Sequence, residues 1–268
     1  MNAIDIVKEQ LSAYEKHMDH AVVTIVHSDG STPRSNGKMI VYADGSTKGT
    51  VGGGAVEQLA ILDAQQCIKE GSNAFRAYDL TSPLSQTGMT CGGNVSMLIE
   101  AFVTRPLLVM CGAGHVGDSV LRLASFAGFE TLLIDDREES AIQDKIALAD
   151  RFVRVKDFEA DIKSMEIPVG AFIVIATHGH AHDGAALSAM TGKGAAYLGM
   201  IGSSKKVAAL FEKLRGCGVS QEALDKVYTP IGLDLGGETP EEIAISIFAE
   251  ILMVKNGRSG AHLAGQLK

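Results

Sequence analysis

A glycine-rich segment in the second half of the chain has the spacing that binds the phosphates of a nucleotide. Gly112, Gly114 and Gly117 form the pattern G-x-G-x-x-G directly after an apolar run (residues 107–111) that is typical of a buried strand. In such a pattern the first glycine permits a tight turn, the second lets a pyrophosphate approach the backbone, and the third lets the following helix lie close to the strand. We therefore predict a nucleotide-type binding turn here.

Two residues of opposite charge follow the next expected strand, residues 131–134. Asp135 stands about 20 residues past the glycine turn, where a carboxylate would accept hydrogen bonds from the ribose 2′-OH of NAD. Arg137 would instead receive the 2′-phosphate of NADP, so the choice between NAD and NADP stays open. His115 and Val116 begin the helix after the turn, and their backbone N–H groups would bind the phosphates. The alternative is that the glycines serve only packing and that Asp135 caps a turn.

A histidine-rich segment follows the expected strand at residues 171–176, at the edge where open α/β sheets bind ligands. His178, His180 and Asp183 have the composition of an H-x-H-x-x-D metal-hydrolase cluster. One short segment supplies no distant ligand, however, so a metal site is the weaker interpretation. We favour a hydrogen-bonded loop or a helix start that Asp183 caps.

Cys91 is the preferred reactive residue of the chain. Gly92 and Gly93 follow it, and backbone N–H groups in such a loop would stabilise a thiolate or bring it to a ligand. The remaining cysteines are expected in structural positions on a helix, in a strand and in a turn: Cys67, Cys111 and Cys217.

Two further glycine-containing loops precede expected helices, and each could bind an anion. The residues concerned are Gly52, Gly53 and Gly54 with Glu57 in the first loop, and Gly202 with Ser203 in the second. Glycines are equally common where a helix packs closely against a strand, and a serine at this position is a common helix cap. The lysines after Ser203 would serve a phosphate or remain solvated.

Composition excludes several classes of protein. The chain has 268 residues and a formal net charge of −8, so it is long enough for two modest domains and has no broad basic surface for nucleic acid. Residues 1–19 alternate charged and apolar residues at helical spacing, which is unlike an export signal. The most apolar helical stretch, residues 243–254, is short and contains the charged Glu250, so we expect no membrane span. The scattered cysteines form no C-x-x-C pair, which favours a reducing cytoplasm.

The expected elements divide the chain near residue 105. Residues 1–104 are expected to form a smaller N-terminal α+β domain with strands at residues 21–27, 38–42 and 95–102. Residues 105–268 are expected to form a Rossmann-type doubly wound parallel sheet, with buried strands at residues 107–111, 131–134, 171–176 and 196–201. Thr239 as N-cap, Pro240 at the first position and Glu242 as capping-box partner predict the last helix. The fold class is therefore α/β.

The order of these loops resembles the XdhC/CoxI family of molybdenum-hydroxylase accessory proteins, and the resemblance spans nearly the whole chain. In the first half the similar residues are Gly30-Ser31-Thr32-Pro33-Arg34 with Gly37 and Met39, residues 49–54 with Glu57, and Cys91-Gly92-Gly93 with Glu100. In the second half they are residues 112–117, Asp135-Asp136-Arg137, Thr177-His178-Gly179-His180 with Asp183, residues 199–203, and residues 231–234 followed by Thr239-Pro240.

The resemblance implies a protein that binds molybdenum cofactor, protects it while its terminal sulfur is installed, and delivers it to a xanthine dehydrogenase-type apo-hydroxylase. Such a protein is a chaperone rather than a catalyst, and its partners would be that apo-hydroxylase and a sulfur-donating cysteine desulfurase. The resemblance also implies that Cys91 contacts the molybdenum or its sulfur and that Arg34, His178 and the glycine loops named above hold the cofactor. We further expect a homodimer.

Two other functions remain open on the sequence. The dinucleotide pattern, with His178 and His180 as acid or base groups, is compatible with an NAD(P)-dependent oxidoreductase. The same histidines with Asp183 would serve a metal-dependent hydrolase, which predicts stoichiometric metal in the purified protein.

Overall fold

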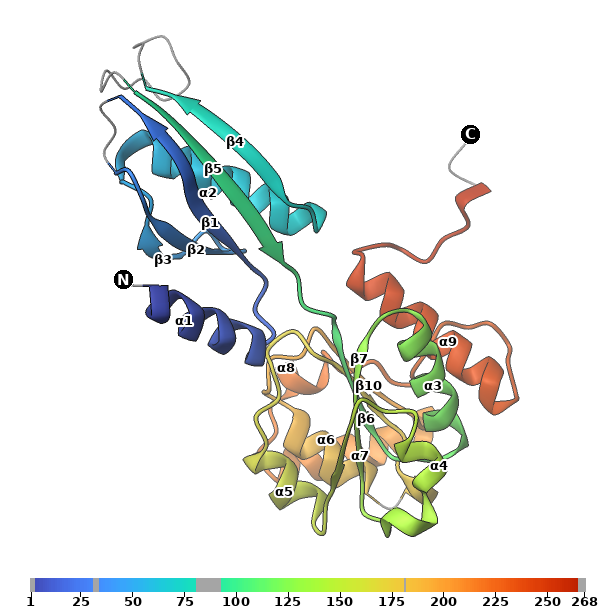
Figure 1. The fold of residues 1–268 in the computed structure, drawn as a ribbon. Helices are drawn as coiled ribbons and strands as arrows, with labels where there is room; N and C mark the ends of the chain where they lie inside the picture. Colours follow the sequence, from blue (N-terminus) through green and yellow to red (C-terminus); the bar gives the residue numbers. More distant parts are fainter. Residues whose placement is uncertain (1–2, 31–33, 81–92, 181, 265–268) are drawn as a thin grey trace. The chain divides into compact units, whose positions relative to one another are not determined.

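The structure is a computed structural model that describes the chain except residues 1–2, 31–33, 81–92, 181 and 265–268. The chain divides into two compact units, Met1–Thr104 and Arg105–Lys268 (Figure 1). Each unit has its own sheet and its own buried core. We therefore describe each unit by itself.

The first unit is a five-stranded antiparallel sheet with the order β3-β2-β1-β5-β4. Its strands are β1 (His20–Asp29), β2 (Lys38–Tyr42), β3 (Thr47–Thr50), β4 (Ala74–Asp79) and β5 (Asn94–Phe102), and its helices are α1 (Ala3–Glu15) and α2 (Gly54–Glu70). One face of the sheet packs against Val56, Ala60 and Ala64 of α2, and Ile6 and Ala13 of α1 belong to a separate small core with residues of β1 and β2.

The second unit is a five-stranded parallel sheet with the order β10-β9-β6-β7-β8. Its strands are β6 (Leu107–Cys111), β7 (Glu130–Asp135), β8 (Arg151–Arg154), β9 (Phe172–Ile175) and β10 (Tyr197–Met200). The chain proceeds from β6 outward to β8 and then returns to the other side of β6 for β9 and β10. The carboxyl end of β6 is therefore the switch point at which open α/β sheets bind ligands.

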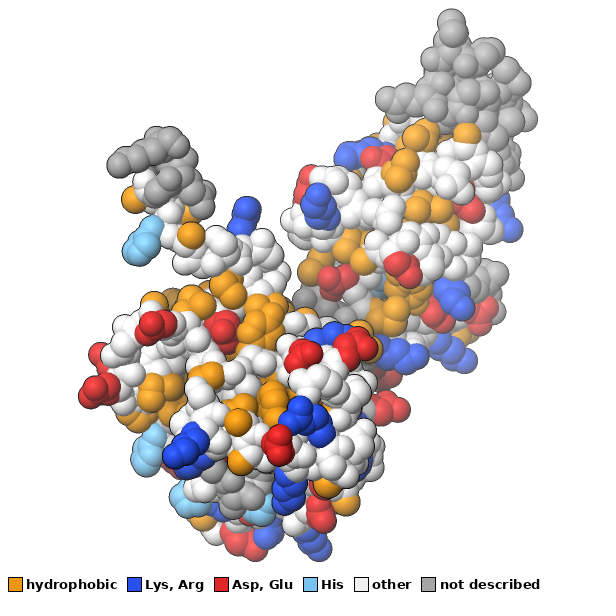
Figure 2. Space-filling model, turned by 180° about the vertical axis from the view of Figure 1, so that it is seen from behind, with side chains coloured by type: hydrophobic (Ala, Val, Ile, Leu, Met, Phe, Trp, Pro, Cys, Tyr) orange, Lys and Arg blue, Asp and Glu red, His pale blue; other side chains and the backbone are white. Residues whose placement is uncertain are grey.

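Helices cover both faces of the parallel sheet. They are α3 (His115–Phe126), η1 (Glu139–Ala141), α4 (Gln143–Ile146), α5 (Phe158–Ser164), η2 (His178–His180), α6 (Asp183–Met190), α7 (Ser204–Gly216), α8 (Gln221–Leu224) and α9 (Pro240–Lys255). Residues of α5, α6, α7 and α8 share one core, and residues of α3 and α9 share the other. Figure 1 shows the two groups of helices on opposite sides of the strands. Charged side chains of both signs are interspersed on the face seen in Figure 2.

The structure confirms the predicted fold class: a Rossmann-type parallel sheet follows an α+β region with an antiparallel sheet. The last helix begins as predicted, because Thr239 accepts the N–H of Glu242 and the Glu242 side chain accepts the Thr239 N–H. Cys67 lies in α2 and Cys111 in β6, as predicted, and both are buried. No helix in the described part of the chain is long and apolar enough to cross a membrane.

Sequence reasoning missed three strands that lie at sheet edges. β3 contains no large apolar residue, β4 is mostly exposed, and β8 has arginine at both ends. Edge strands bury little side-chain area, so their residues lack the alternation or the apolar run by which strands are recognised. Pairing with β2, β5 and β7 defines them in the structure.

Candidate functional site

The glycine turn after β6 contains three glycines. Neighbouring atoms leave no room for a side chain at two of them, and the third has open space around it. Gly112 has φ of 110°, and a Cβ there would lie 2.2 Å from the carbonyl oxygen of Ala176. A Cβ on Gly117 would lie 2.2 Å from the carbonyl oxygen of Gly112. Gly114 instead has φ of −77°, and a Cβ there would meet no atom within 4 Å. The backbone at Gly114 is therefore the open part of the turn.

Helix α3 starts at this open backbone. Gly114 is its N-cap and has no side chain to cap the helix, and the Asp118 N–H makes the first bond of the helix, 2.9 Å to the carbonyl oxygen of Gly114. His115 is exposed and Val116 is half-buried at this end. The backbone N–H groups of a first helical turn lack partners within the helix and carry partial positive charge. An anion bound at this turn would therefore meet accessible backbone N–H groups and a favourable electrostatic field.

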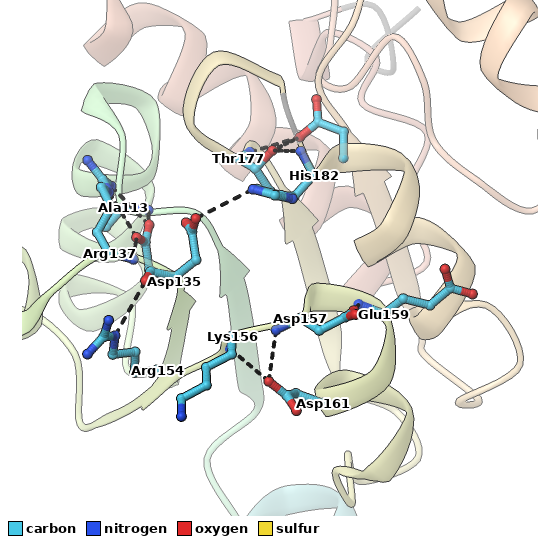
Figure 3. A network of polar contacts seen from close by, with 12 residues as sticks. Ala113, Asp135, Arg137, Arg154, Lys156, Asp157, Glu159, Asp161, Thr177 and His182 are labelled. Carbon is cyan, nitrogen blue, oxygen red and sulfur yellow. Dashed lines mark hydrogen bonds and ion pairs between the residues drawn. The ribbon is translucent and has the colours of Figure 1, made fainter.

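Asp135, at the end of β7, lies against the same turn with its side chain 1% exposed (Figure 3). Its Oδ2 accepts the Ala113 N–H at 2.6 Å and Arg137 Nη2 at 2.9 Å. Its Oδ1 accepts Arg137 Nε at 2.8 Å and the Arg137 N–H at 3.0 Å. Burial opposes ionisation, but the hydrogen bonds from Arg137 and Ala113 outweigh it and hold the pKa of Asp135 below its ordinary value.

These contacts bear on the predicted ribose site. Asp135 reaches the turn, as the prediction requires, but both of its oxygens already accept hydrogen bonds from the chain. A ribose hydroxyl would have to compete with the Arg137 guanidinium for the carboxylate. The roles predicted for Asp135 and Arg137 as ligand-reading groups remain predictions.

Hydrogen bonds to Asp183 stabilise the segment after β9. Its Oδ1 accepts the Thr177 N–H at 2.9 Å and the Thr177 hydroxyl at 2.6 Å, and the Thr177 hydroxyl oxygen accepts the His182 N–H at 3.1 Å. The hydrogen-bonded loop that we favoured is present, but His182 is the N-cap of α6 and Asp183 is its first residue. Asp183 thus holds the preceding loop instead of capping the helix.

Of the three candidates in the weaker metal-site interpretation, the structure describes the side chains of His178 and Asp183. His178 is exposed in η2, and the side chain of His180 lies outside the described residues. Across the residues with described positions, no group of three or more His, Cys, Asp or Glu side chains could hold a metal ion.

A polar contact that sequence reasoning missed connects the loops after β7 and β9. His182 Nε2 lies 3.4 Å from Asp136 Oδ2, and the His182 ring stacks on Phe158 with a centroid distance of 5.0 Å. Because β6 lies between β7 and β9 in the sheet, these two loops flank the glycine turn. The segments are far apart in the sequence, so only the strand order could have indicated this contact.

In the first unit, a carboxylate in the first turn of α2 binds the glycine-rich loop that precedes this helix. Glu57 Oε2 accepts the N–H groups of Val51 and Gly53, both at 3.0 Å, and the hydroxyl of Thr50. The Gly52 N–H donates to Thr50 Oγ1 at 3.1 Å. Burial opposes ionisation of Glu57, but these hydrogen bonds outweigh it and lower its pKa. Of the N–H groups that were predicted to bind an anion, that of Gly53 therefore already binds Glu57 and that of Gly52 binds Thr50, and a bound phosphate remains a prediction.

The structure places the other predicted residues separately. Gly202 and Ser203 follow β10, where Ser203 is the N-cap of α7 and is exposed. Arg34 is exposed in the first unit, and the carbonyl oxygen of Gly93 accepts the Leu80 N–H at 2.9 Å. Cys91 and Gly92 lie outside the described residues, so their predicted role has no structural account.

Comparisons with known proteins find two family models that match separate parts of the chain. Residues 13–79 match the XdhC and CoxI family, and residues 108–251 match the XdhC Rossmann domain. The chain is 35% identical to the "Uncharacterized protein YqeB" of Escherichia coli over 96% of this chain and 47% of that protein. It is 27% identical to a probable xanthine dehydrogenase subunit of Bacillus subtilis over 60% of this chain and 46% of that protein. The chain thus spans about half the length of these two relatives.

A third relative has a length similar to that of this chain. The "Molybdenum cofactor insertion chaperone PaoD" of Escherichia coli is 24% identical over 87% of this chain and 83% of that protein.

Proposed function

The chain belongs to the XdhC and CoxI family, and from this we propose that it is an accessory protein of molybdenum enzymes. In this proposal it binds molybdenum cofactor as cargo, protects it during sulfuration and delivers it to a xanthine dehydrogenase-type hydroxylase. Similarity to a protein named a molybdenum cofactor insertion chaperone supports the assignment. The apo-hydroxylase and a sulfur-donating cysteine desulfurase are the partners that this function requires.

The open backbone at Gly114 is the observation that carries the proposal. Molybdenum cofactor is a pterin with a phosphate or a dinucleotide extension, and a phosphate binds well where N–H groups at a helix start are accessible. Gly114 combines that accessibility with the start of α3 at the switch point of the sheet. The N–H groups of His115 and Val116 would bind the phosphate, and the His115 side chain lies exposed beside them.

Cys91 supplies the proposed contact to the metal end of the cargo. A thiolate is a soft ligand that suits molybdenum or its terminal sulfur, and the family resemblance gives this role to Cys91. Asp135 accepts only some of the N–H groups of the Arg137 guanidinium. The remaining donors of Arg137 would bind a phosphate of the cargo.

Retention of the cargo tests the proposal. Purified full-length protein is mixed with molybdenum cofactor, separated by gel filtration and assayed for pterin in the protein fraction. We expect retention by the wild type, a loss of about 10-fold in affinity for Gly114→Val, and weaker retention for Cys91→Ala. Gly216→Val is the control, because Gly216, the last residue of α7, also has open space for a Cβ and no positive φ. Absence of pterin in the wild-type fraction would refute cargo binding.

A dinucleotide-dependent oxidoreductase is the second candidate, and the strand order with the glycine turn favours it. Arg137 already donates hydrogen bonds to both oxygens of Asp135, which weighs against binding of a ribose diol by this carboxylate. Fluorescence titration with NADH and NADPH separates the candidates, since a dehydrogenase must bind one of them and reduce or oxidise a substrate. Binding of neither would eliminate the oxidoreductase and leave the accessory function intact.

A further inference from the structure

We infer that the second unit has another binding site, between α6 and α7, for a small organic anion with an apolar body. The site is a cavity of about 400 Å³ beyond the carboxyl end of β10. It shares no residue with the glycine turn, and the inference goes beyond the proposed function. A cavity of this volume is in the range that binds small molecules.

The walls of the cavity are largely apolar. Met200 of β10 and Val207, Leu210 and Leu214 of α7 line it, and each is buried or half-buried. A Cβ on Gly184 of α6 would lie 2.7 Å from Leu210 Cδ1, so this glycine lets α6 and α7 approach closely at one end. Apolar walls around an existing cavity favour the aromatic or aliphatic body of a ligand.

Two lysines of α7 add positive charge to these walls. Lys206 and Lys213 both line the cavity, and neither has an ion pair with any residue that the structure describes. Other cations of the same unit are paired, such as Lys163 with Glu159 and Lys226 with Glu222. The lysines are separated by two helical turns, about 10 Å along the axis. An anionic group on the ligand would therefore meet two lysines that have no ion pair with a described residue.

The start of α7 strengthens the preference for an anion. No acidic residue occupies its first turn, and Ser203 at the N-cap makes no side-chain hydrogen bond to the described backbone. The positive end of the helix and Lys206 thus act in the same direction. An anionic group near Lys206 would gain from both.

The carboxylates of the cavity are occupied by other groups. Glu159 accepts Lys163 Nζ at 2.6 Å and the Ser188 hydroxyl at 3.2 Å, while Asp183 accepts the two donors of Thr177. These bonds partly offset the negative charge of both acids. Each acid thus already accepts hydrogen bonds from the chain, whereas neither lysine has an ion pair with a described residue, and the arrangement fits an aryl or alkyl carboxylate, sulfonate or phosphate.

The first test compares two dyes that share an apolar body. The probe 8-anilinonaphthalene-1-sulfonate carries a sulfonate, whereas N-phenyl-1-naphthylamine has the same rings without the charge. Fluorescence titration of the full chain should give saturable binding of the sulfonate, at least 5-fold tighter than binding of the neutral dye. Equal affinity for the two dyes, or no saturable binding of the sulfonate, would overturn the proposal.

Matched lysine variants locate the site. Lys206→Gln should weaken binding of the sulfonate about 5-fold. Lys205→Gln removes the same charge from the same helical turn but does not line the cavity, so its affinity should change by less than about 2-fold. Equal effects of the two substitutions would show that binding is not at this cavity and would overturn the proposal.

Cys217 gives an independent readout because it lines the cavity and is exposed. Its reaction with N-ethylmaleimide, followed by mass spectrometry of the peptide that contains it, should slow at least 3-fold when the sulfonate dye is present. The same dye concentration should slow the reaction much less in Lys206→Gln. An unchanged rate in wild-type protein saturated with dye would contradict the site.

Discussion

Arg137 holds the carboxylate of Asp135 through two guanidinium hydrogen bonds, from Nε to Oδ1 at 2.8 Å and from Nη2 to Oδ2 at 2.9 Å (Figure 3). The same carboxylate accepts the Ala113 N–H inside the glycine turn. Asp135 therefore connects the turn after β6 to the loop after β7. The residue that sequence reasoning assigned to a ribose has a clear structural task within the chain.

Removing the charge of Asp135 should destabilise the second unit. Asp135→Asn keeps the shape of the side chain but weakens hydrogen bonds of a charge-assisted type, so we expect a loss of about 2 kcal/mol in the free energy of unfolding. Urea-induced unfolding followed by circular dichroism measures it. Asp136→Asn is the control: its exposed pair with His182 should contribute less than about 1 kcal/mol. Equal losses in the two variants would contradict the structural role of Asp135.

The same carboxylate should make stability depend on acidic pH. The pKa of Asp135 in the folded protein lies below its ordinary value of 3.8, so its contribution is complete above that value and is lost as the pH falls through the folded pKa. The difference in unfolding free energy between wild type and Asp135→Asn should stay constant from pH 7 to about pH 5 and shrink below about pH 4. A difference that grows on acidification would show the opposite sign and disprove this assignment.

Two glycines of the turn, Gly112 and Gly114, should respond differently to alanine. Gly112→Ala places a Cβ against the Ala176 carbonyl at a positive φ, and we expect a loss of about 2 kcal/mol or more in unfolding free energy. Gly114→Ala should change it by less than about 1 kcal/mol, because the space is open and φ is negative. Thermal unfolding of both variants checks this order, and a reversal would show that the open backbone at Gly114 is wrongly identified.

Glu57 should be replaceable by an external anion. Glu57→Ala removes the acceptor of the Val51 and Gly53 N–H groups, so phosphate should raise the melting temperature of this variant more than that of the wild type. Glu70→Ala removes an exposed charge from the same helix and should respond like the wild type. An equally large phosphate response in wild-type protein would mean instead that the loop binds anions with Glu57 in place.

Local patterns were sufficient to predict much of the fold. The apolar run before Gly112, the glycine spacing and the capping box at Thr239 each depend on neighbours in sequence, and the structure has the corresponding strand, turn and helix. The central strands were predictable because burial on both faces makes them continuously apolar. The edge strand β8 was not, since its pairing with β7 requires knowledge of the sheet order.

The candidate site was harder to predict because its key contacts join distant residues or reverse a local expectation. The spacing of Asp135 from the turn was correct for contact, but sequence could not show that Arg137 would occupy the carboxylate. Glu57 was recognised beside a glycine loop, yet its bonds to Val51 and Gly53 depend on the loop conformation. The cavity beside Lys206 depends on how α6 and α7 pack, which no local pattern specifies.

Cargo retention and transfer test the central claim most directly. Full-length protein is loaded with molybdenum cofactor, passed through gel filtration and added to a xanthine dehydrogenase-type apo-hydroxylase, and pterin content and hydroxylase activity are measured together. The proposed function predicts that pterin elutes with the protein and that activity appears in proportion to the loaded protein. Elution of all pterin as free small molecule, with no activation of the hydroxylase, would contradict it.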